Sequence, residues 1–91
     1  MSTAQLPGAE LVETGLADLT RGVESAAALL VAIGAPRLRQ LGIPVPEGPA
    51  QPEHRLYALL ARDDADSAHA RYNALLRRLV SYERAYASAG R

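Results

Sequence analysis

The sequence has no cysteine, no phenylalanine, no tryptophan and no lysine. The absence of cysteine excludes disulfides and thiolate metal sites. The two histidines, His54 and His69, have no second ligand one helical turn away, so we predict no metal site. No Gly-rich phosphate loop and no Ser–His–Asp arrangement is present, and we expect no cofactor. The longest apolar run, residues 26–33, is too short to span a bilayer.

The missing large aromatic residues also limit the core. A chain of 91 residues fits one domain, and its core must be built from Leu, Val, Ile and many Ala. A core with so few large side chains favours oligomerisation, which buries more surface per chain. We therefore expect a single helical domain over residues 1–91, with a flexible N-terminus at residues 1–7. The sequence does not open with the basic and apolar segments of a secretory leader, so we expect a cytoplasmic protein without membrane contact.

Charge is unevenly distributed although the formal net charge is zero. Residues 1–35 hold one arginine and four acidic residues, a net charge of −3, whereas residues 67–91 hold five arginines and one glutamate, a net charge of +4. This pattern favours an acidic first helix beside a basic last helix, either within the fold or across a dimer. The alternative is a basic face that binds nucleic acid.

The first half of the chain has helical periodicity. Apolar residues keep one helical phase over residues 9–33, with acidic residues on the opposite side, which predicts one long first helix. The alternative left open by the sequence is a break at Gly22, with Ser25 as the cap of a second helix.

Glycine and proline divide the middle of the chain. We expect Gly34 to interrupt the first helix and Pro36 to open a short second helix over residues 37–41. Residues 42–52 are rich in proline and predict an extended connecting loop. Pro52 suits the first turn of a third helix of medium length.

The last helix shows the clearest pattern, from Asp66 to about Ser88. Its apolar residues alternate in steps of four and three, and Leu76 and Val80 widen the stripe: Ala68, Tyr72, Leu75, Leu79, Tyr82 and Tyr86. This period predicts a long helix packed against other helices. The fold class predicted is therefore all-α, a small bundle of about four helices with long first and last helices, completed by dimerisation.

The same stripe is the candidate interface, because tyrosine offers apolar area together with a polar tip. Glu83 lies within the stripe, where a buried carboxylate needs a partner such as Arg37, Arg39 or Arg55. If the helix has left the core by residue 83, Glu83 is instead exposed. The interface residues predicted are Tyr72, Leu75, Leu79, Tyr82, Glu83 and Tyr86.

We interpret the chain as a non-enzymatic interaction or scaffold module that acts as a homodimer or with a helical partner. The alternative rests on Arg62 and His69, which are separated by six residues near the start of the last helix. This spacing is similar to the Arg-x4-6-His signature of the higher-eukaryote-and-prokaryote nucleotide-binding (HEPN) family, although the common His-x-Tyr extension is absent. The resemblance implies a dimeric, metal-independent ribonuclease, with His69 as general base and Arg62 stabilising the developing negative charge.

Overall fold

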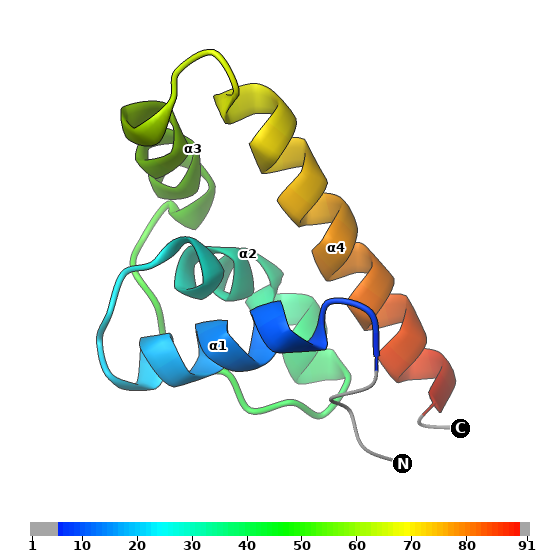
Figure 1. The fold of residues 1–91 in the computed structure, drawn as a ribbon. Coiled ribbons are helices and arrows are strands. Elements are labelled where there is room, and N and C mark those ends of the chain that lie inside the picture. The colour runs from blue at the N-terminus through cyan, green and yellow to red at the C-terminus, as the bar shows by residue number, and fades with distance from the viewer. Residues whose placement is uncertain (1–5, 90–91) are drawn as a thin grey trace.

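The computed structural model describes residues 6–89, which form four α-helices and no β-strand. The helices are α1 (Ala9–Thr20), α2 (Ala26–Gln40), α3 (Pro52–Asp63) and α4 (Ala68–Ala89). In Figure 1, α1 and α2 form one packed pair, and α3 and α4 form a hairpin from which α4 runs down along the pair. The predicted all-α class is confirmed for this part of the chain, whereas dimerisation stays a prediction.

The prediction of one long helix over residues 9–33 is wrong, because the backbone leaves the helix at Gly22. Gly22 has a φ of 74°, a left-handed conformation that glycine adopts at little cost. Its N–H donates to the Leu19 carbonyl at 3.1 Å, and the Val23 N–H donates to the Asp18 carbonyl at 2.8 Å. This pair of hydrogen bonds is a Schellman motif, which ends a helix even where the apolar phase continues.

The second helix starts at the cap that the alternative interpretation named. The Ser25 hydroxyl accepts a hydrogen bond from the Ala28 N–H at 3.1 Å and donates one to Asp18 Oδ2 at 2.6 Å. Ser25 therefore satisfies a free N–H of the first turn of α2 and ties this turn to the end of α1.

The helix α2 continues through Gly34 and Pro36, so the predicted short second helix is also wrong. Leu38, which is fully inaccessible, lies two residues beyond the proline, so the continuous helix carries a core residue past Pro36. Gly34 is a contact point: a Cβ there would lie 2.9 Å from Leu79 Cδ2 of α4. The helix ends at Gln40, and Gly42, which has a φ of 91°, closes a second Schellman motif.

Residues 41–51 form the connection between α2 and α3. Ile43 and Val45 are buried, each 8% exposed. The Arg39 guanidinium donates to the Val45 carbonyl at 2.8 Å, so the connection is fixed to the end of α2. As predicted, α3 begins at Pro52. Of the predicted flexible N-terminus, residues 1–5 lie outside the described part of the chain.

The helix α2 supplies more of the core than any other helix. Eight of its residues are buried, whereas only Ala68, Leu79 and Tyr82 are buried in the 22 residues of α4. The longest helix thus buries a smaller share of its residues than α2, although Tyr72, Leu75, Leu76 and Tyr86 also pack against the core. No helix between residues 6 and 89 is long and apolar enough to cross a membrane.

Leu79→Ala should lower the free energy of unfolding by about 2–5 kcal/mol, because it removes a buried side chain that packs on Gly34. Ser81→Ala, at an exposed position of α4, should change it by less than about 0.5 kcal/mol. Chemical denaturation of the three proteins measures both values. Equal losses at the two positions would show that this rotational placement of α4 is wrong.

Candidate functional site

The stripe predicted as an interface faces the chain's own core. Leu79 and Tyr82 are only 4% and 3% exposed. The other four predicted residues are half-buried, and three of these pack against the core: Tyr72, Leu75 and Tyr86. The helical period is the same whether a stripe packs within a chain or between chains, so the sequence could not separate the two. An interface role for these residues stays a prediction.

A neighbouring flank of α4 carries the exposed apolar surface. Val80 was expected to widen the buried stripe, but it is 40% exposed, and that expectation is wrong. It belongs to an open groove of about 470 Å³, whose lining is Asn73, Leu76, Arg77, Val80, Ser81 and Arg84. We call these six residues the α4 groove. Its sequence signal is the pair Leu76 and Val80, one helical turn apart, with Arg77 three residues before Val80 and Arg84 four residues after it.

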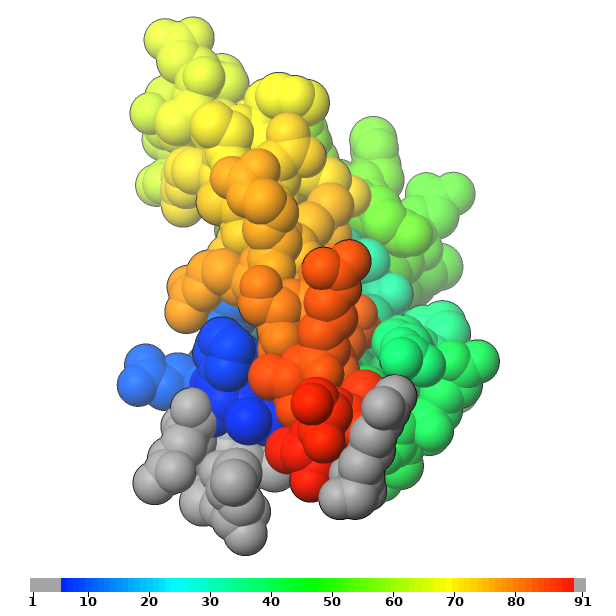
Figure 2. All heavy atoms as spheres, turned by 90° about the vertical axis from the view of Figure 1, so that its right-hand side faces the viewer, coloured from blue at the N-terminus to red at the C-terminus, as the bar shows by residue number. Residues whose placement is uncertain are grey.

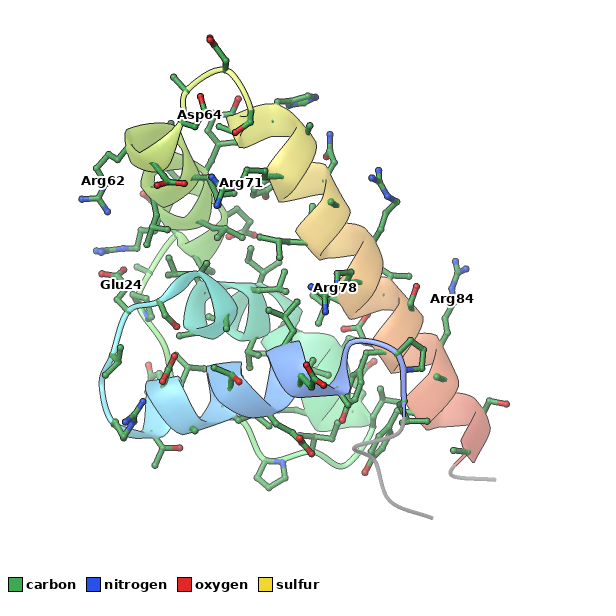
Figure 3. All side chains as sticks on the ribbon, viewed as in Figure 1. Glu24, Arg62, Asp64, Arg71, Arg78 and Arg84 are labelled. Carbon is green, nitrogen blue, oxygen red and sulfur yellow. The ribbon has the colours of Figure 1, made fainter. Side chains whose placement is uncertain are left out.

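Arginines on α4 differ in what they contact. Arg71 forms an ion pair with Asp63 of α3 at 2.7 Å, and Figure 3 shows it between α3 and α4. Arg77, Arg78 and Arg84 are exposed, and no ion pair shorter than 4 Å involves them among residues 6–89. In Figure 3 the side chain of Arg84 points away from the bundle. The positive charge of α4 is therefore largely available to a partner.

The acidic first helix approaches α4 at its start. A Cβ on Gly8 would lie 2.9 Å from the Arg78 carbonyl oxygen, and Glu10 lines the same shallow recess as Arg78. No ion pair joins α1 to α4 in the described part of the chain. The first and last helices, which we expected to pair along their charged sides, are close where the start of α1 lies beside Arg78 of α4.

Glu83 lies at the edge of the contact between α2 and α4. Its Oε2 atom is 3.2 Å from the position that a Cβ on Gly34 would occupy, and the residue is half-buried. Burial raises the pKa of the Glu83 carboxyl above its ordinary value of 4.5, and the positive charge of Arg37 lowers that pKa part of the way back. Of the three predicted partners, Arg37 is the one whose charge acts on the Glu83 carboxyl. No ion pair shorter than 4 Å involves Glu83 among residues 6–89.

Arg62 and His69 are not assembled into a site within one chain. Both are exposed, and Figure 3 shows Arg62 on the side of α3 that faces away from α4, the helix carrying His69. The His69 ring instead lies 6.5 Å from the ring of Tyr57, and its Nε2 atom is 3.2 Å from Asn73 Nδ2. A site using both residues would need a second protomer.

The chain matches no protein-family model, no curated protein and no solved structure. Within residues 6–89, no group of three or more His, Asp or Glu side chains is placed to hold a metal ion. The surface chemistry of α4 is therefore the basis for a functional proposal.

Glu83→Gln should stabilise the fold at pH 7 and make no difference well below pH 4.5. A carboxyl whose pKa is raised by folding binds its proton more tightly in the folded state, so stability falls as the pH rises through this range. An uncharged amide of similar shape avoids that loss. Denaturation midpoints at the two pH values measure the effect.

Glu47→Gln, at an exposed loop position, is the matched control and should leave the midpoint unchanged at both pH values. If Glu83→Gln were less stable than the wild type at pH 7, the ionised carboxylate would be favourably paired, and burial would not be the dominant effect.

Proposed function

We propose that this chain is a small helical protein-interaction module and that the α4 groove is its contact surface. The observation that carries the proposal is the exposed flank of α4, the longest helix, which has only three buried residues. On this flank Val80, 40% exposed, lies between Arg77 and Arg84. An apolar strip bordered by guanidinium groups has the composition of a protein interface, in which arginine is enriched.

Homodimerisation is the form of this proposal that the sequence favoured. The lean core supports it, because association would bury further apolar surface. The mass in solution separates a homodimer from a monomer that binds another protein, and either result is compatible with the α4 groove as the contact surface.

Val80→Glu should abolish association without unfolding the chain, since it places a carboxylate on the apolar floor of the α4 groove at an exposed position. Light scattering after size exclusion measures self-association, and affinity capture from the native host compares the partners of wild type and variant. Val23→Glu is the matched control, because Val23 is 44% exposed and lies in the turn between α1 and α2. The proposal would be contradicted if the wild type stayed monomeric and if the wild type and Val80→Glu captured the same proteins.

Nucleic-acid binding is the second candidate, favoured by the exposed and unpaired positions of Arg77, Arg78 and Arg84 in the described part of the chain. A surface that contacts phosphates must lose affinity steeply as salt increases. HEPN-type ribonuclease activity is the enzymatic version of this candidate, and it would require Arg62 and His69.

Incubation with structured and unstructured RNA, without added metal, tests the enzymatic version. Arg62 and His69 are not assembled within one chain, so cleavage that depends on both would need a second protomer to complete the site. For an interaction module, we expect no such cleavage. The readout is cleavage by the wild type, His69→Ala and Arg62→Ala. Cleavage that disappears in both variants would establish the ribonuclease, whereas cleavage that persists in both would indicate contamination.

A further inference from the structure

The floor and the rim of the α4 groove have different chemistry. Leu76 and Val80 lie one turn apart and form an apolar floor, and Arg77 and Arg84 lie seven residues apart along one side. Seven residues of helix correspond to about 10 Å along the axis, and the whole groove, from Asn73 to Arg84, to about 16 Å. Figure 2 shows this stretch of α4, in orange, crossing the face of the molecule. A partner must therefore match an apolar strip beside two cations at a fixed spacing.

The two cations of the α4 groove are not engaged by the chain's own carboxylates. The ion pairs of residues 6–89 use other arginines: Arg21 with Asp18, Arg55 with Glu24 and Arg71 with Asp63. Glu10 of α1 shares a recess with Arg78, which projects from a different side of α4 toward α1. No carboxylate of residues 6–89 therefore forms an ion pair with Arg77 or Arg84, and both exposed guanidinium groups are open to an acidic partner.

We propose that the α4 groove binds one acidic amphipathic helix of another protein. Apolar side chains of this helix, spaced three or four residues apart, cover Leu76 and Val80, and two carboxylates seven residues apart meet Arg77 and Arg84. A helix presents residues seven apart on one face at about 10 Å, the spacing of the two arginines. This inference rests on the proposed function and specifies the partner's chemistry.

Other occupants fit the α4 groove less well. Two copies joined through this groove across a two-fold axis would bring the same arginine-bearing patch to both sides, and the arginines of one would approach those of the other. A nucleic-acid backbone would neutralise the arginines but would leave Leu76 and Val80 facing phosphates, without apolar contact. An acidic amphipathic helix provides apolar contact for Leu76 and Val80 and carboxylates for Arg77 and Arg84.

A displayed library of single helices, about four turns long so that they span the groove, tests the inference. Helices are selected on the whole chain with their groove-facing positions randomised. We expect the selected helices to carry two carboxylates a heptad apart beside an apolar strip. Arg84→Glu should weaken a selected helix roughly tenfold, because it puts like charges together. The difference between wild type and variant should shrink as salt increases.

Arg62→Glu is the matched control, since it makes the same charge change at an exposed position on α3 and should leave binding unchanged. Suppose that the selected helices lose binding to Val80→Glu but show neither enriched carboxylates nor sensitivity to Arg84→Glu. This result would overturn the inference of an acidic partner and leave the proposed function standing. Helices indifferent to Val80→Glu, or no selected helix, would overturn both. Salt-sensitive binding of a DNA duplex that Arg84→Glu abolishes would overturn the inference in favour of nucleic acid.

Discussion

The hydrogen-bonded carboxylate of Asp18 is the constraint on which the arrangement of the helices depends. Asp18 is only 7% exposed, and it accepts hydrogen bonds from the Ser25 hydroxyl and the Arg21 guanidinium. These two donors lower the pKa of the carboxyl, the Ser25 hydrogen bond first. Because Ser25 also caps α2, one side chain fixes the end of α1 and the start of α2 together. The reversal of the chain direction at this turn lets α2 pack back along α1.

The close packing of α2 on its neighbours then determines where α4 lies. On one side, a Cβ at Gly15 of α1 would overlap the Ala27 carbonyl oxygen and Val31 Cγ2, so α1 and α2 approach backbone to backbone. On another side, Gly34 lets Leu79 of α4 rest on the α2 backbone. This close approach at Gly34 fixes the α2 side of α4, and the Arg71–Asp63 ion pair and the Tyr57–Tyr72 ring contact join α4 to α3. Much of the circumference of α4, including the α4 groove, is left outside the core.

The sequence pattern predicted those elements whose signals are local and uncontested. Pro52 at the start of α3 and the stripe of α4 follow from backbone restriction and periodicity. The break at Gly22 stood only as the alternative because the apolar phase is continuous across it, and phase carries no information about the Schellman hydrogen bonds that end α1. The continuation through Pro36 was missed for the opposite reason, since burial of Leu38 outweighs the local cost of the proline. The exposure of Val80 could not be predicted from the sequence, because it depends on which helices α4 packs against in the tertiary structure.

Exposure changes abruptly around α4, and this change separates the side of the helix that packs on the core from the side that faces solvent. Leu79 is 4% exposed and Val80 is 40% exposed, although they are adjacent in the chain. One residue rotates about 100° around a helix, which moves the side chain from the α2 contact to solvent. The strip through Leu79 and Tyr82 therefore contributes to folding, Leu76 lies half-buried at its edge, and the flank through Val80 and Arg84 lies outside the core. Because Val80 and Arg84 lie outside the core, substitutions at these two positions can change the surface of α4 without disturbing the packing of Leu79 on α2.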